Sequence, residues 1–456
     1  MIKLHGNQRF TLRLLFLILI VSMLFNPTLI FGNPYKKFKK SFQPIDNHIK
    51  HLFEKTVKLY LQDDLWEKGL DYDAGHALMV PLHAAFILDI NDWRLQFEKH
   101  FKRFMEQDRR TFLDLNADDD LARLHYLYLV SRFIALKSDR LQKNGNISAT
   151  LVARLYKDAE MLWMKKEAWW YGGRRFIGGI RERLEWKLNV KNVKYSYYRA
   201  IIDHDLFLSA IAADLRIYEI NRVPKRSWSP IISDILKKVF ETIQSRMLFT
   251  ESGGCLFQPG VWRDHPDYNY VGNVQIRPDL SVKKIADISE DSLHSHRWPL
   301  WLTSLRGASV NDQEQYEYYG RVIKALEMQF YEHVLVLPAA NFAGLRLNNF
   351  MDGRNGVYRY GYITQGKGRG YGPYQLSGIL PVGWWGFLIS ERINNAWKIM
   401  SQYFHLEDNV LTTYVGPNTT RKRHPLVTWP QFFLNGFAEL NVRLMGEIQD
   451  ELLNER

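Results

Sequence analysis

The feature that most constrains the fold of this chain is a helical hydrophobic period, about 3.6 residues long, that recurs along most of its length. In residues 44–66 the apolar side chains of Ile45, Ile49, Phe53 and Val57 follow this period. Comparable segments lie at residues 74–88, 93–106, 117–136, 149–163, 198–220, 229–247, 291–305, 312–333, 384–404 and 429–453. The pattern predicts an all-α protein.

Helices joined by short loops pack as antiparallel hairpins, and a long series of hairpins curves into a solenoid or closes into a ring. Strand-like alternation is confined to short stretches such as residues 187–195 and 411–415. Polar, glycine-rich segments separate the helices at residues 167–180, 251–281, 339–381 and 406–428. Such loops, gathered at one end of a ring, would build a deep cleft.

The N-terminus has the pattern of a targeting segment. Lys3, Arg9 and Arg13 precede an apolar stretch at residues 14–25, which is short for a membrane span and typical of a signal-peptide core. We predict a signal peptide in residues 1–32, a single domain in residues 33–456, and export to the periplasm or the medium. Four lysines between positions 36 and 40 hinder export, so residues 14–31 could instead stay as a membrane anchor.

Residues 349–381 abandon the helical period and hold eight glycines, five tyrosines and three arginines. Disordered segments avoid aromatic residues, so this stretch is expected to be an ordered loop, and long ordered loops are usually functional. Tyr371 and Tyr374 offer flat faces for a ring-shaped substrate, and Arg354 offers a positive fork. The simpler interpretation is a surface loop that covers a helix bundle.

The net charge favours an anionic partner. The chain has 61 Lys and Arg against 49 Asp and Glu, which gives +12. Three of these positive charges and no acid lie in residues 1–32, so a mature chain would carry +9. No nucleic-acid-binding motif is present, and we predict no nucleic-acid partner. An acidic polysaccharide fits better, and a membrane surface is a partner only if the N-terminal segment is uncleaved.

The repeated helices, the export segment and the aromatic loops together resemble the (α/α) toroid enzymes that process polysaccharides, a group with both lyases and glycoside hydrolases. The resemblance covers roughly residues 45–450 and is one of architecture, without a shared residue motif. It implies an (α/α) toroid or an incomplete helical-hairpin barrel with long functional loops and few short strands. Fold alone does not fix chemistry.

The densest polar cluster lies in residues 289–299. Asp291 could cap a helix that begins here, but two histidines and an arginine exceed what a cap requires. His296 could act as a base near pH 7, and Arg297 could bind a uronate carboxylate. His294 and Trp298 are further candidates for substrate contacts.

Two other segments carry candidate residues. Asp203 and His204 lie at the edge of an apolar helical pattern, where a carboxylate could orient an imidazole, or where the pair could serve as a helix cap and a core histidine. In residues 260–272, Trp262 could stack on a sugar and His265 could make polar contacts. A folded surface loop is the simpler interpretation of that segment.

No metal site and no cofactor are predicted. Asp73, His76 and His83 could share a helical face, as cleft-lining, structural or metal-binding residues, but their spacing is weak evidence for a metal. Residues 366–372 read GKGRGYG and lack the ending of a phosphate-binding loop. Cys255 is the only cysteine, so no intrachain disulfide can form.

The candidates fit a polysaccharide lyase best. A lyase removes the proton beside a uronate carboxylate, so it needs an acid, a base and a group that neutralises the carboxylate. We assign Tyr360 as base or acid with His296 as its partner, and Tyr358 as a near-equal substitute for Tyr360. Arg354 and Asn355 would hold the carboxylate.

Two alternatives remain open. A glycoside hydrolase would need two carboxyl groups at a set separation, and Asp203 and Asp291 are among those available. A non-catalytic glycan-binding or envelope protein would need the aromatic and basic residues alone.

Overall fold

The structure is a computed structural model, and it describes residues 45–140, 147–361, 369–417 and 423–455. The predicted signal peptide in residues 1–32 lies outside the described residues, and so do residues 366–368 of the GKGRGYG segment, whereas its residues 369–372 are described. Among the described residues, no helix combines the length and the apolar character that a membrane crossing requires.

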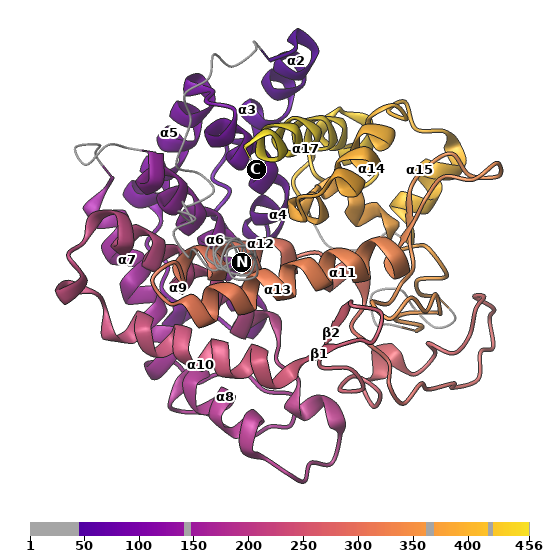
Figure 1. Cartoon of the computed structure of the whole chain (residues 1–456), viewed down its shortest axis with the longest axis horizontal. Helices are drawn as coiled ribbons and strands as arrows, with labels where there is room; N and C mark the ends of the chain where they lie inside the picture. Colours follow the sequence, from indigo (N-terminus) through magenta and orange to yellow (C-terminus); the bar gives the residue numbers. More distant parts are fainter. Residues whose placement is uncertain (1–44, 141–146, 362–368, 418–422, 456) are drawn as a thin grey trace, which may run out of the picture.

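Helices dominate the described chain (Figure 1). Those of the first half are α2 (Asn47–Lys55), α3 (Val57–Tyr60), α4 (Asp71–Ile87), α5 (Asn91–Gln107), α6 (Ala117–Arg140), α7 (Ala149–Glu160), α8 (Gly179–Asn189) and α9 (Asp203–Arg222). Those of the second half are α10 (Pro230–Arg246), α11 (Ser292–Ser295), α12 (Trp298–Ala308), α13 (Gln313–Gln329), α14 (Glu391–Ser401), α15 (Asp408–Val415), α16 (Gln431–Leu434) and α17 (Phe437–Asn454). The prediction of a predominantly helical protein is confirmed.

The strands of the described residues form two small antiparallel hairpins. β1 (Met247–Phe249) pairs with β2 (Cys255–Phe257), and β3 (Leu335–Val336) pairs with β4 (Arg346–Leu347). β2 carries Cys255, which is buried, and burial raises the pKa of its thiol to about 12. The few short strands expected from the sequence are therefore present, at positions that the sequence did not indicate.

Two local predictions were wrong. Residues 187–195 were expected to alternate as a strand, but α8 extends to Asn189, and residues 411–415 lie inside α15. α8 itself was missed because Arg183 and Lys187 point into the protein and interrupt its apolar stripe. The helix expected at residues 291–305 is divided into α11 and α12 at His296 and Arg297.

The helix α4 lies at the centre of the packing. Nearly all of its side chains are buried, which is typical of a helix surrounded by other elements. It packs on α5, α6 and α17. At its closest approach to α6, a Cβ on Gly75 would lie 2.5 Å from the carbonyl oxygen of His125, so this position requires glycine.

Further helix pairs follow one another along the chain. α6 packs on α9, α9 packs on α12, and the short helix Trp384–Phe387 packs on both α12 and α17. Figure 1 shows the C-terminal helix α17 beside the N-terminal helices α2 and α4, which it contacts. One continuous apolar core extends through these elements from Ile49 to Leu452. The toroidal arrangement itself stays a prediction.

The long loops gather on one side of the helices. Figure 1 shows the connections that precede α11, together with those that follow α13, on the right of the view, near α15. Residues 349–361 and 369–376 have no regular helix or strand, as expected, and a short helix begins at Ser377. These loops cover one end of α4, α11 and α12 and supply much of the candidate site.

A buried ionic cluster attaches α8 to α9. The Asp205 carboxylate accepts hydrogen bonds from Arg183 Nε at 3.1 Å, from Lys187 Nζ at 3.0 Å and from the backbone N–H of Ile202 at 3.0 Å. Burial alone would raise the pKa of this carboxyl, but Arg183 and Lys187 lower it to about 2. The cluster therefore depends on a carboxylate that stays charged.

We expect Asp205→Ala to lower the free energy of unfolding by about 3–5 kcal/mol, because it leaves two buried cations without their partner. Urea denaturation at pH 7 measures the change. The matched control is Glu54→Ala, which removes a surface ion pair with Lys58 and should cost less than about 1 kcal/mol. Equal effects of the two substitutions would contradict this account of the cluster.

A candidate active site on the loop side of the helices

A cavity of about 410 Å³ opens between the N-terminal part of α4, the α11–α12 junction and the loops. Tyr72, Asp73 and His76 line it from α4. The α11–α12 junction and the loop before the helix at Ser377 contribute Leu293, His294, His296, Arg297, Arg359, Tyr371, Gln375 and Leu376. The C-terminal third of the chain adds Arg423, Val427, Trp429 and Phe432. Its lining thus combines segments far apart in the sequence.

The guanidinium of Arg297 connects three helices at this cavity. It is 2% exposed. Its Nη1 donates to the Asp203 carboxylate on α9, its Nη2 donates to the Tyr72 hydroxyl on α4 at 2.8 Å, and its Nε lies 3.4 Å from His76 Nε2. Because each of its nitrogen atoms already has a partner, Arg297 acts mainly as a fixed positive charge in the wall of the cavity.

Asp291 and His294 form an oriented pair. The Asp291 carboxylate caps α11 by accepting from the backbone N–H of His294 at 2.9 Å, and it also accepts from the Tyr268 hydroxyl at 2.8 Å. It lies 2.8 Å from His294 Nδ1. A charged carboxylate only accepts, so Nδ1 carries a hydrogen and donates it to Asp291, and Nε2 is the nitrogen left for other partners.

Electrostatic attraction stabilises the pair of Asp291 and His294. Although burial alone would raise the pKa of Asp291, its charge interaction and hydrogen bond with His294 lower it below its ordinary value. The His294 side chain is 23% exposed and lines the cavity, and its Nε2 forms no hydrogen bond with any described residue. The pair therefore presents a basic nitrogen whose orientation is fixed from behind.

Two further histidines line the cavity as neutral rings. His76 and His296 are stacked with ring centroids 5.2 Å apart. Burial lowers the pKa of both rings, and the nearby Arg297 charge lowers it further. His296 Nδ1 donates to the Leu293 carbonyl, and its buried Nε2 has no partner among the described residues.

Two arginines reach the cavity from different loops. Arg359 donates from Nε to Asp267 at 2.9 Å, and Arg423 lies 3.5 Å from Asp73 and over the Trp429 ring at 5.6 Å. Both side chains are only about one-fifth exposed, at 22% and 20%. With Arg297 they place three guanidinium groups in the lining, each paired with a carboxylate, and Asp73 is the only carboxylate that itself lines the cavity among the described residues.

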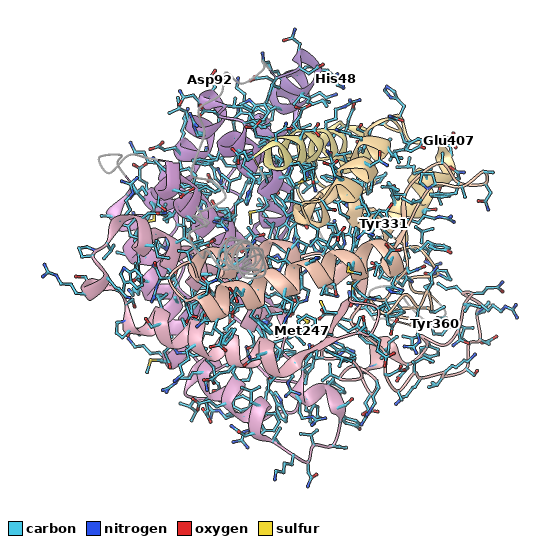
Figure 2. The ribbon with its side chains drawn as sticks, viewed as in Figure 1. His48, Asp92, Met247, Tyr331, Tyr360 and Glu407 are labelled. Atoms are coloured by element: carbon cyan, nitrogen blue, oxygen red, sulfur yellow. The ribbon has the colours of Figure 1, made fainter. Side chains whose placement is uncertain are left out.

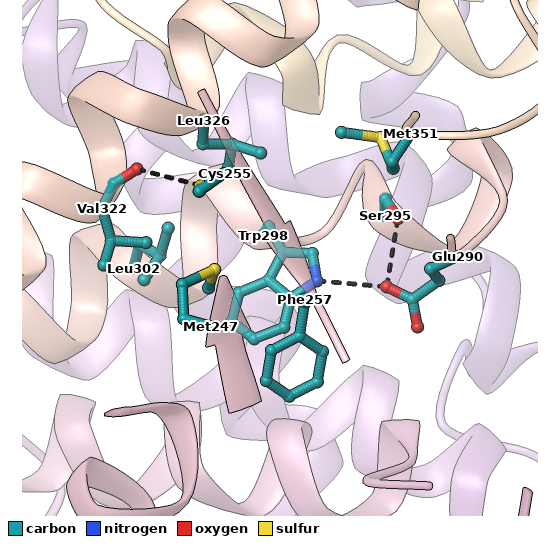
Figure 3. A pocket seen from close by; sticks show the side chains of 10 residues that line it. All are labelled: Met247, Cys255, Phe257, Glu290, Ser295, Trp298, Leu302, Val322, Leu326 and Met351. Atoms are coloured by element: carbon teal, nitrogen blue, oxygen red, sulfur yellow. Dashed lines mark hydrogen bonds between the residues drawn. The ribbon is translucent and has the colours of Figure 1, made fainter. Parts of the chain in front are cut away.

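A second, much smaller cavity lies behind the site (Figure 3). Its volume is about 20 Å³, enough for roughly one water molecule. Glu290 points into it and accepts from Ser295 Oγ at 3.0 Å and from Trp298 Nε1 at 3.2 Å. Burial, helped by the neighbouring Asp291 and Asp203, raises the pKa of Glu290 to about 7.

The structure brings several of the predicted site residues together. His294, His296, Arg297 and Tyr371 line the cavity. Two of the predicted carboxylates stand directly behind them, as Asp291 contacts His294 and Asp203 contacts Arg297. The cluster at residues 289–299 is therefore part of one site with the 349–381 loop and α4.

Other predicted catalytic residues lie elsewhere. The Tyr360 hydroxyl donates to the carbonyl oxygens of Arg277 and Pro278 among the peripheral loops, where Figure 2 labels it. Tyr358 is buried behind the cavity against Tyr268, with ring centroids 5.2 Å apart. His204 is bound through Nε2 to the Ala117 carbonyl at 2.9 Å. None of these three side chains lines the 410 Å³ cavity.

The predicted carboxylate-binding pair also stands apart from the cavity. Arg354 forms ion pairs with Asp352 at 2.7 Å and with Asp287 at 3.1 Å. The Asn355 side-chain oxygen accepts from the backbone N–H of Tyr374 at 2.9 Å and thereby shapes the loop. These contacts support the loop rather than a ligand.

The predicted stacking residues are divided among different surroundings. Trp298 faces the small inner cavity, and Tyr374 lies against Arg346, whose guanidinium is 4.5 Å from its ring centroid. Trp262 and His265 pack together with ring centroids 5.5 Å apart. Both rings also lie near Tyr171, close to the outer edge of the site.

Sequence reasoning missed part of the cavity wall. Tyr72, Arg423 and Trp429 were not proposed, and for Asp73 and His76 a cleft-lining role was one alternative beside structural and metal-binding roles. The sequence did contain a signal for the role of α4, because polar residues recur on consecutive turns of a helix that is otherwise apolar. No local pattern marked Arg423, because its place in the site depends on the way in which α17 returns to α4.

No group of three or more histidine, cysteine or acidic side chains with metal-binding geometry occurs among the described residues. Comparison of the chain with family models, with curated proteins and with solved structures gives no match. The geometry of the site is therefore the basis for inferring its chemistry.

We expect Glu290 to make stability depend on pH. Its folded pKa of about 7 lies above the ordinary value of 4.5, so its contribution is complete below about pH 4.5 and is lost as the pH rises through 7. Between pH 5 and pH 8 the wild type should lose roughly 2–3 kcal/mol that Glu290→Gln does not lose. Urea denaturation across this pH range measures the difference.

The matched control for this experiment is Glu54→Gln on the exposed face of α2. It should retain the wild-type dependence on pH. If Glu290→Gln shows the same decline between pH 5 and pH 8 as the wild type, Glu290 is ionised throughout and the assignment is wrong.

Proposed function

We propose that this chain is an exported carbohydrate-active enzyme that cleaves an acidic polysaccharide by β-elimination. The observation that carries the proposal is the composition of one cavity, in which an Asp291-oriented His294, the phenol of Tyr371 and three arginines meet. Such an assembly supplies a base, an acid and positive charge for a carboxylate.

The charge of the cavity supports an anionic sugar. A uronate that enters it meets Arg359 and Arg423 at the loops and the fixed charge of Arg297 in the wall. Guanidinium groups bind carboxylates through paired donors. Neutralising the carboxylate lowers the barrier to a carbanion-like state at the adjacent carbon, which is the difficult step of this elimination.

The proposed reaction uses two further side chains. His294 Nε2 takes the proton from the carbon beside the carboxylate, and the electron pair left behind forms a carbon–carbon double bond. The glycosidic oxygen leaves and takes a proton from the Tyr371 hydroxyl. Asp291 stabilises the imidazolium that forms.

Hydrolysis is the second candidate and has weaker support. A glycoside hydrolase of the ordinary kind needs two carboxyl groups beside the scissile bond. Among the described residues that line the cavity, Asp73 is the one carboxylate, and it lies 3.5 Å from Arg423. Asp291 stands behind His294 and is 1% exposed, so it is poorly placed to meet a sugar.

The proposal includes an (α/α) toroid as the scaffold. In support, the helix pairs run from α4 to α6, α9 and α12, then through Trp384–Phe387 to α17 and back to α4. A second helix accompanies several of these, since α5 packs on α4, α10 on α9, α13 on α12 and α14 on α17. Two concentric layers of helices would produce these contacts.

We expect the purified protein to generate products that absorb ultraviolet light, because elimination leaves an unsaturated, conjugated uronate end. A panel of alginate, polygalacturonate and hyaluronan tests this. His294→Gln removes the titratable nitrogen and should lower kcat by about 10²–10⁴-fold, while His333→Gln on the surface should leave the rate unchanged. New reducing ends without absorbance would favour hydrolysis, and binding without either product would favour a glycan-binding protein.

We also expect Tyr371→Phe to lower kcat by at least about 10²-fold, because it removes the proposed proton donor to the leaving oxygen. Tyr360→Phe is the matched control, since it removes a phenol from the same loop outside the cavity. Steady-state rates of both variants on the same polymer decide between them. A large loss with Tyr360→Phe and none with Tyr371→Phe would return the catalytic role to Tyr360.

A further inference from the structure

A strip of aromatic rings extends from the edge of the cavity to the protein surface. Trp169 and Tyr171 are in contact with ring centroids 4.5 Å apart, and Tyr171 meets Tyr197 at 5.2 Å. Tyr197 lies parallel to Tyr195 at 5.6 Å with an interplanar angle of 12°. We call these four side chains the aromatic strip. They come from two loops, one before α8 and one after it.

The middle of the aromatic strip adjoins the site. Tyr171 contacts His265 with ring centroids 5.5 Å apart, and His265 lies beside Asp267, the partner of the cavity residue Arg359. The Tyr171 hydroxyl is also close enough to Asp203, the partner of Arg297, for the two to interact electrostatically. The middle of the strip therefore lies beside the carboxylates that anchor two of the cavity arginines.

The two ends of the strip are open to water. Trp169 is 38% exposed and Tyr195 is 36% exposed, although most large aromatic side chains of this protein lie in its core. Exposed aromatic rings that lie side by side leave apolar surface in water, and such surface often marks a binding site. Nothing in the packing of α8 requires these two rings to be exposed.

The charges around the strip are favourable to an acidic chain. The ammonium of Lys194 lies 5.2 Å from the centroid of the Tyr195 ring, and neither Lys194 nor Lys191 forms an ion pair with a described residue. Two acids of neighbouring segments, Glu167 and Asp264, are each paired with an arginine, at 2.7 Å and 3.7 Å. Net positive charge therefore lies beside the flat ring faces.

We propose that the aromatic strip binds the sugar rings that adjoin the cleaved bond, so that the chain acts on a long acidic polysaccharide rather than on a disaccharide. The inference rests on the proposed function and adds to it a second, non-catalytic binding region. The apolar C–H face of a pyranose covers an aromatic ring, while Lys191 and Lys194 attract the carboxylates between successive contacts.

Binding of defined ligands to the folded full chain tests this. Alginate, polygalacturonate and hyaluronan are each used as polymer and as disaccharide, and affinities are measured by calorimetry on the His294→Gln variant, so that no turnover interferes. Tyr195→Ala should weaken binding of the polymer by about 5–10-fold and leave binding of the disaccharide unchanged. Phe249→Ala, which removes a ring of the same 36% exposure elsewhere on the surface, is the matched control.

The outcomes separate the strip from the catalytic proposal. Loss of polymer affinity with Tyr195→Ala supports the strip even if no unsaturated product forms, in which case the elimination chemistry alone is wrong. Unsaturated product together with unchanged polymer affinity in both Tyr195→Ala and Trp169→Ala overturns the strip and leaves the lyase proposal standing. Equal weakening of polymer and disaccharide also overturns it, because the rings would then act within the cavity.

Discussion

The buried ion pair between Arg297 and Asp203 is the constraint on which the site depends. A guanidinium that is 2% exposed can remain charged only if its donors are satisfied. Its partners lie on α9 and α4, and Arg297 itself stands at the junction of α11 and α12. The pair thus fixes the positions of the helices around the cavity, and it holds the guanidinium in the wall without the cost of an unpaired ion.

The charge of Arg297 also affects the protonation of neighbouring side chains. It helps burial to keep His76 and His296 neutral, while the adjacent Asp291 remains charged against His294. Three histidines in one cavity therefore have different chemical roles. Two serve as neutral hydrogen-bonding groups, and one has a carboxylate behind it that can stabilise a positive charge. The difference arises from partners on neighbouring elements and not from the histidines themselves.

The helical class and most helix positions could be predicted from the sequence, because an apolar stripe at helical spacing is a local property. α8 escaped prediction because its inward-facing Arg183 and Lys187 are paired with a carboxylate on another helix. Within the site, the cluster around His294 was recognisable as an excess of polar residues at a helix start. Tyr371 lines the cavity whereas Tyr360 does not, and Arg423 belongs to the lining as well. These positions depend on tertiary packing, which spacing along the chain does not encode.

The burial of Cys255 on β2 has a practical consequence. It is the only thiol in the chain, and a side chain that is 2% exposed with a pKa near 12 has almost no thiolate at neutral pH. The native protein is therefore silent toward maleimides and similar reagents. A cysteine engineered on the outer surface would be the sole position labelled in the folded state, so a fluorophore or spin label could follow ligand capture in real time without a cysteine-free background.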